Sequence, residues 1–99
     1  MAIRTFDITK QTNGGADRQY SGTITIASDE MLRIRFTEFF GDADASLEIN
    51  ANGVLSFVSI DHDEAWATAA VVAGDVCRLS VNLNGDNRSV VKGIMETFS

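Results

Sequence analysis

The residues of this sequence that could do chemistry are mainly carboxylates gathered at its turns. Asp42, Asp44 and Ser46 have the alternate spacing with which an EF-hand calcium loop begins, because every second oxygen can converge on a hard cation. The match then stops, since Leu47 stands where that loop needs a glycine and Gly53 where it needs a bidentate glutamate. The sequence therefore contains no EF-hand. A looser calcium site remains an alternative, with ligands from Asp42, Asp44, Asp61 and Asp63.

The single histidine is the other candidate for chemistry. His62 is surrounded in sequence by three carboxylates and could orient a metal or exchange protons, but adjacent residues rarely converge on one substrate atom. Cys77 could be paired with His62 as a nucleophile, yet its strand pattern places Cys77 on an apolar face, where thiols are usually inert. No nucleophile elbow, nucleotide-binding loop or zinc spacing occurs. We therefore predict that the chain is not an enzyme.

Composition narrows the range of partners. The net charge is −6 with only eight lysine and arginine residues, so nucleic-acid binding is not expected.

One cysteine excludes an intrachain disulfide and favours a reducing compartment. Charges at Arg4, Asp7 and Lys10 interrupt the N-terminal stretch, which argues against a secretory signal and a membrane span. We expect a cytoplasmic location, or a particle assembled in the cytoplasm, and no cofactor apart from the calcium alternative.

The segments between the turns alternate with the period of two that is typical of strands with one buried face. This alternation predicts strands at residues 23–26, 32–36, 46–50 and 76–83, and a less regular one at 3–9. Residues 54–60 are apolar on both faces, as in a central strand or an interface strand. The preceding Asn52-Gly53 predicts a hairpin, because both residues tolerate the positive φ angles of a type I′ turn.

Two segments fit either a helix or a strand. We favour a strand at residues 64–73, because the valines around Gly74-Asp75 suit a tight hairpin. We also favour a strand over residues 88–98, where Gly93 would cost a helix about 1 kcal/mol. The prediction is one all-β domain over residues 1–99, an antiparallel sandwich or small barrel of seven or eight strands. Jelly-roll and immunoglobulin-like architectures both fit, with one short helix as an alternative.

If every connection reverses the chain, successive turns lie at alternate ends of the sheets. The loops near residues 13–17, 41–44, 61–64 and 84–88 then share one end, which we call the acidic loop end. Because loops on a rigid scaffold often carry function, we predict binding residues there. They are Asp17, Asp42, Asp44, Asp61, His62, Asp63, Glu64 and Asp86.

Three functions follow from these patterns. The first is a non-catalytic protein-interaction or assembly module that associates with itself, because residues 54–60 are apolar on both faces, the surface is acidic and no catalytic motif occurs. The second is a calcium- or carbohydrate-binding module that uses the acidic loop end. The third is a small acidic inhibitor that mimics nucleic-acid phosphates toward a basic protein partner. The predicted interface residues of the first function are Phe39, Phe40, Val54, Val58, Ile60 and Trp66.

Overall fold

The computed structural model of the chain describes residues 3–9, 17–28, 30–60, 66–85 and 88–98, and at Trp66 it describes the backbone alone. The described residues form strands and turns without a helix, so no described helix could cross a membrane. The strands are β1 (Ile3–Thr9), β2 (Arg18–Tyr20), β3 (Ile24–Thr25), β4 (Glu30–Phe40), β5 (Asp44–Ala51), β6 (Val54–Ile60), β7 (Trp66–Val71), β8 (Val76–Asn82) and β9 (Val90–Phe98).

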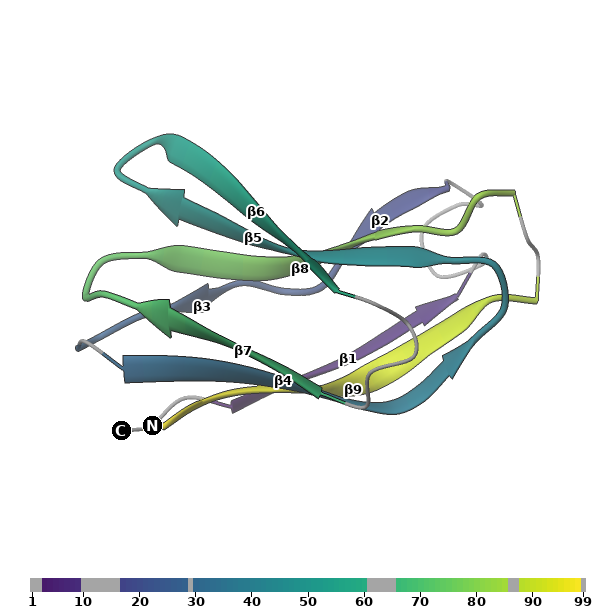
Figure 1. The fold of residues 1–99 in the computed structure, drawn as a ribbon, viewed down its shortest axis with the longest axis horizontal. Helices are drawn as coiled ribbons and strands as arrows, with labels where there is room; N and C mark the ends of the chain where they lie inside the picture. Colours follow the sequence, from purple (N-terminus) through teal and green to yellow (C-terminus); the bar gives the residue numbers. More distant parts are fainter. Residues whose placement is uncertain (1–2, 10–16, 29, 61–65, 86–87, 99) are drawn as a thin grey trace.

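Two antiparallel sheets pack face to face, and they form the lower and upper layers of Figure 1. The first sheet has the strand order β1-β9-β4-β7, and the second has the order β2-β8-β5-β6, with β3 also paired to β8. If β2 and β3 are counted as one interrupted strand, this is the strand order of a jelly roll. The predicted all-β sandwich is confirmed, and the architecture is an open sandwich rather than a closed barrel.

Both ambiguous segments are strands where the structure describes them. β7 pairs with β4 in the first sheet and β8 lies in the second, so the predicted hairpin across Gly74-Asp75 is wrong and this turn connects the two sheets. β9 lies between β1 and β4. The alternative of a short helix at either place is therefore wrong for residues 66–71 and 90–98. The sequence patterns did not predict β2, because three residues are too few for an alternation to be recognised.

Gly93 explains why β9 can lie between two neighbours. It is paired with Phe6 on one side and Phe36 on the other. A Cβ atom at this position would overlap the carbonyl oxygen of Arg35 and lie 2.9 Å from the Phe6 ring. The absence of a side chain lets the two phenylalanine rings meet edge to face, with their centroids 5.9 Å apart. The glycine that disfavours a helix here is thus required for close packing of the sheet.

The core lies between the sheets and takes alternate residues from both. Strand β8 illustrates the pattern, since Cys77, Leu79 and Val81 are completely buried while Arg78 lies on the outer face. Burial, and to a smaller extent the charge of Asp75, raise the pKa of the Cys77 thiol from 9.0 to about 11. Cys77 is therefore a core residue, and its raised thiol pKa agrees with the prediction that it is inert. The largest fully buried side chains are Ile26, Leu32, Ile34, Leu79, Leu83 and Met95.

The predicted hairpin between β5 and β6 is present. Asn52 and Gly53 have φ angles of 55° and 87°, as a two-residue turn of the primed type requires. The side-chain oxygen of Asn50 accepts a hydrogen bond from the Gly53 amide at 2.7 Å, which holds the turn in shape. This local geometry sets the register of the whole hairpin, from Ala51 opposite Val54 to Ala45 opposite Ile60.

Candidate functional site

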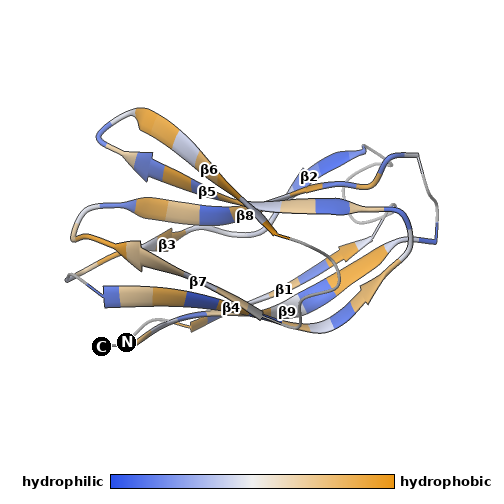
Figure 2. Ribbon diagram, in the orientation of Figure 1, coloured by the Kyte–Doolittle hydropathy of each residue, from blue (hydrophilic) through white to orange (hydrophobic). Residues whose placement is uncertain are grey.

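Strand β6 is the most unusual element of the molecule, because it is apolar and yet largely uncovered. It lies at the end of the second sheet and pairs only with β5 among the described strands. Figure 2 shows how much of this strand has hydrophobic colouring. All its residues except Ile60 are exposed, and the exposed fractions are 70% for Val54, 52% for Leu55, 58% for Phe57 and 40% for Val58.

The register with β5 assigns each β6 side chain to a face. Val58 is opposite Leu47, which is buried in the core, so the even-numbered residues of β6 lie on the inner face of the sheet. Phe57 is opposite Glu48, whose partner Arg78 lies on the outer face, so the odd-numbered residues lie on that face. Apolar side chains are therefore uncovered on both faces of one strand, and burial of both would require a neighbour along its free edge.

The backbone of β6 also offers hydrogen bonds along that edge. In a two-residue hairpin, the residues that flank the turn exchange both of their hydrogen bonds, and the pairs beyond them alternate. This alternation directs the amide and carbonyl groups of Leu55, Phe57 and Ser59 away from β5. β6 has seven residues without a charge or a proline, and among the described residues no strand pairs with its outer edge, so two of the usual ways to protect a sheet edge are missing.

The predicted interface residues have different environments. Phe40 is 57% exposed at the end of β4, and Val54 and Val58 belong to the uncovered strand. Phe39 packs against the core and lies edge to face with the Phe36 ring, with centroids 5.0 Å apart. Ile60 is buried in the core of this chain. Trp66 begins β7, and its side chain lies outside the described residues.

Sequence reasoning missed two residues of this surface. Leu55 and Phe57 were assigned to one apolar face of a two-sided strand, and only the other face was predicted as an interface. The signal that could have found them is the Asn52-Gly53 turn, because its register places Leu55 opposite Asn50 and Phe57 opposite Glu48. A polar face of β5 predicts that the residues opposite it also point to solvent.

The acidic loop end is partly within the described residues. Asn84 connects two of its loops, since its side-chain amide donates to the carbonyl oxygen of Asp42 at 3.1 Å and to Oδ2 of Asp44 at 3.0 Å. The Gly85 amide donates to Oδ1 of Asp17 at 3.1 Å, which adds a third loop. The structure thus brings Asp17, Asp42 and Asp44 to one end. The other predicted residues lie outside the described part: Asp61, His62, Asp63, Glu64 and Asp86.

Two of these carboxylates already accept hydrogen bonds that join the loops, which is a sufficient structural reason for their positions. Within the described part of the chain, no group of three or more histidine, cysteine or acidic residues is placed to hold a metal ion. The calcium site that includes Asp61 and Asp63 falls partly outside that part of the chain and stays a prediction.

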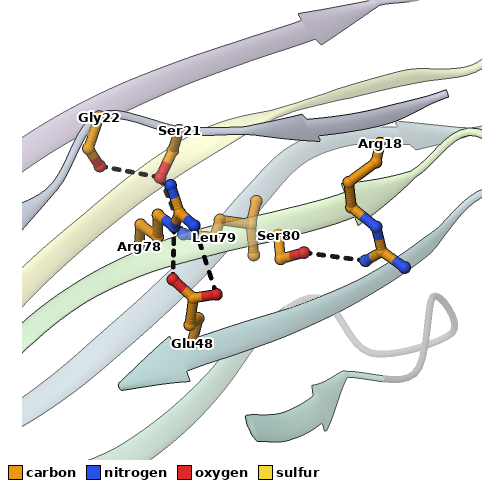
Figure 3. Close-up of polar contacts among 7 residues, drawn as sticks. All are labelled: Arg18, Ser21, Gly22, Glu48, Arg78, Leu79 and Ser80. Atoms are coloured by element: carbon orange, nitrogen blue, oxygen red, sulfur yellow. Dashed lines mark hydrogen bonds and ion pairs between the residues drawn. The ribbon is translucent and has the colours of Figure 1, made fainter. Parts of the chain in front are cut away.

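A polar strip crosses the outer face of the second sheet next to β6, and Figure 3 shows its Glu48–Arg78 and Arg18–Ser80 contacts. Arg78 forms an ion pair with Glu48, and its guanidinium carbon lies 3.7 Å from the centre of the Tyr20 ring. Arg18 donates a hydrogen bond to the Ser80 hydroxyl at 2.9 Å. Glu48 and Arg78 carry opposite charges, so this ion pair adds no net charge to the strip.

A shallow depression of about 330 Å³ lies beside this ion pair. Leu55 of β6 forms part of its wall, together with Thr23, Glu48, Asn50, Val76 and Arg78. The two arginines of β4 face the other way, on the outer face of the first sheet, where Arg33 and Arg35 both pair with Glu96 at 2.7 and 3.1 Å. Arg78 is therefore separate from them, and the three arginines form no common basic strip.

Comparisons with known proteins identify no family. No protein-family model and no curated protein matches the sequence. A solved structure with some resemblance is the GH26-CBM35 β-(1,4)-mannanase of Podospora anserina, with a TM-score of 0.42 and 19% sequence identity over 99% of this chain. The match covers 26% of the mannanase chain, so the present chain spans about a quarter of its length. A resemblance this distant carries no argument about function.

Proposed function

We propose that this chain is a non-catalytic interaction module that associates with itself through β6. The observation that carries the proposal is the exposure of β6 on both faces together with an edge that no other described strand pairs with. Burial of a leucine or phenylalanine side chain contributes about 1.5 to 3 kcal/mol, and a symmetric interface would gain this contribution from each copy. The uncharged strand thus combines a large apolar gain with backbone groups that are ready to pair.

Charge supports self-association through this strand rather than through other surfaces. Two copies of a chain with a net charge of −6 repel each other at long range. No β6 residue is charged, and Glu48 on the neighbouring strand is neutralised by Arg78. Two copies that meet along β6 therefore bring no like charges into direct contact. The two other functions, calcium or carbohydrate binding at the acidic loop end and inhibition of a basic protein, stay alternative predictions.

The test is the solution mass of the protein by light scattering, at low and high salt. We expect a discrete oligomer that persists at high salt, because salt screens repulsion and leaves apolar contacts intact. Phe57→Glu should give the monomer mass, since each copy would bring a charge into the interface. Ile3→Glu is the matched control, because Ile3 is 62% exposed and its strand, β1, belongs to the other sheet.

A wild-type protein that is monomeric at every concentration and salt level would contradict the proposal. Salt-sensitive capture of a basic protein would then favour the inhibitor function, since binding of opposite charges weakens as salt is added.

A further inference from the structure

We infer that two copies of the chain pair antiparallel through β6 across a two-fold axis at Phe57, which joins their second sheets into one continuous sheet. This inference rests on the proposed function and specifies its geometry. The resulting strand order would be β2-β8-β5-β6 followed by the same strands of the second copy in reverse. Addition of a strand to an exposed sheet edge is an established mode of recognition.

The direction of the backbone groups restricts how two β6 strands can pair. Leu55, Phe57 and Ser59 direct their amide and carbonyl groups to the free edge, as the hairpin register requires. A hydrogen-bonded pair across the new interface must join two residues of this set. A two-fold axis adjacent to Phe57 places Phe57 opposite its own copy and Leu55 opposite Ser59, so all three outward residues find partners.

In this register every residue of β6 lies opposite a residue of the second copy. The residues opposite each other would be Val54 with Ile60, Leu55 with Ser59, Ser56 with Val58, and Phe57 with Phe57. All seven residues of β6 are paired, whereas a shift by two residues along either strand leaves part of the edge unpaired. On the outer face the large Leu55 meets the small Ser59, and two phenylalanine rings meet at the axis.

A second copy fits this edge better than a partner of different chemistry. The large and small residues of β6 are complementary about Phe57, because Leu55 would face Ser59 and Ser56 would face Val58, and the strand contains no charge that would need a complement. The arrangement is also closed, because each copy contributes its β6 edge and the axis pairs the two edges with each other. The other edge of the same sheet consists of the three-residue β2, which carries Arg18, and the two-residue β3, so each offers a much shorter ladder.

A proline at position 59 tests the backbone pairing without removal of an apolar side chain. The Ser59 amide points away from β5, so Ser59→Pro should preserve the hairpin and delete a hydrogen bond to the second copy. We expect the dimer mass to fall to the monomer mass, with an unchanged far-UV spectrum. Ser59→Ala is the matched control and should remain dimeric, because it keeps the amide.

Disulfide trapping tests the register. Residues that form a hydrogen-bonded antiparallel pair have Cα atoms about 5.5 Å apart, within disulfide reach. Phe57→Cys should therefore give a covalent dimer on mild oxidation. Leu55→Cys should not, because the two copies of residue 55 are offset by four residues, or about 13 Å. The native Cys77 is completely buried, so the wild-type protein is the blank for both variants.

The outcomes separate the inference from the proposed function. Loss of the dimer with Ser59→Pro, together with crosslinking of Phe57→Cys alone, would support the two-fold pairing. An oligomer that survives Ser59→Pro and shows no crosslink at position 57 would overturn this geometry and leave self-association standing. Crosslinking at position 55 instead of position 57 would also overturn it. A wild-type monomer at all concentrations would overturn both.

Discussion

Strands β9 and β6 differ in a way that their compositions do not explain. β9 contains a lysine, a glycine, a glutamate and a threonine, yet it lies between β1 and β4 and alternate residues along it are buried. β6 contains only apolar residues and serines, yet it is exposed along six of its seven positions. At Gly93 the molecule lacks room for one methyl group, whereas the side chains of β6 are exposed to solvent. Position in the sheet, rather than hydrophobicity, decides which strand stabilises the fold and which is available for binding.

The largest effect should distinguish core from edge directly. Leu79 is completely buried on β8, so Leu79→Ala should lower the free energy of unfolding by about 3 to 4 kcal/mol. Phe57→Ala removes more atoms but should cost less than about 1 kcal/mol in a monomeric background such as Ser59→Pro, because the ring is mostly in solvent. Urea unfolding of each variant measures both values. Equal losses at the two positions would show that β6 is covered within one chain.

A second experiment probes the tightness of the β9 packing. Gly93→Ala should lower the free energy of unfolding by about 2 to 3 kcal/mol, because the new Cβ overlaps the backbone oxygen of Arg35 and crowds Phe6. Lys92→Ala is the control on the same strand, since it removes side-chain atoms rather than adding them. Urea unfolding measures both. A loss below about 0.5 kcal/mol for Gly93→Ala would mean that β9 and β4 separate easily.

The pH dependence of the free energy of unfolding tests the burial of Cys77 in the core. Because the pKa of Cys77 is raised in the folded protein from 9.0 to about 11, the unfolded chain loses this proton first as the pH rises. The stability associated with this proton is fully present below about pH 9 and decreases as the pH approaches 11, where the loss amounts to ~2 kcal/mol. Cys77→Ala should flatten this part of the stability curve. Rapid reaction of the native thiol with a thiol reagent at pH 8 would contradict the assigned burial.

The smallest effect concerns the acidic loop end. Added calcium should leave the melting temperature unchanged if the carboxylates of this end serve to join its loops, as the hydrogen bonds of Asp17 with Gly85 and of Asp44 with Asn84 indicate. A bound ion would instead stabilise the folded state by mass action. Thermal unfolding with calcium and with a chelator measures the difference. A rise of several degrees that Asp44→Asn abolishes would make calcium binding the better function for that end.

Local patterns predicted much of the fold. The alternation of residues 76–83 predicted the buried face of β8, and Asn52-Gly53 predicted the hairpin that the φ angles confirm. The helix alternatives arose because short apolar segments suit either structure until their neighbours are known. The three-residue β2 could not be found from its own sequence, since it is held by pairing with β8. For the candidate site, the pattern identified residues 54–60 as apolar on both faces, but the predicted interface did not include Leu55 and Phe57, which the structure shows to be exposed.

The sequence by itself determined the strands with one polar face, the tight turns and the burial of Cys77, because each depends on neighbours within a few residues. The tertiary structure decided that β6 lies at an edge, that β9 lies at a centre, and that Gly93 must lack a side chain. These features depend on which distant strands pair, and strand order is set by the packing of the two sheets as a whole. The sequence pattern of an apolar strand is the same whether the strand is buried by its own chain or exposed at a sheet edge.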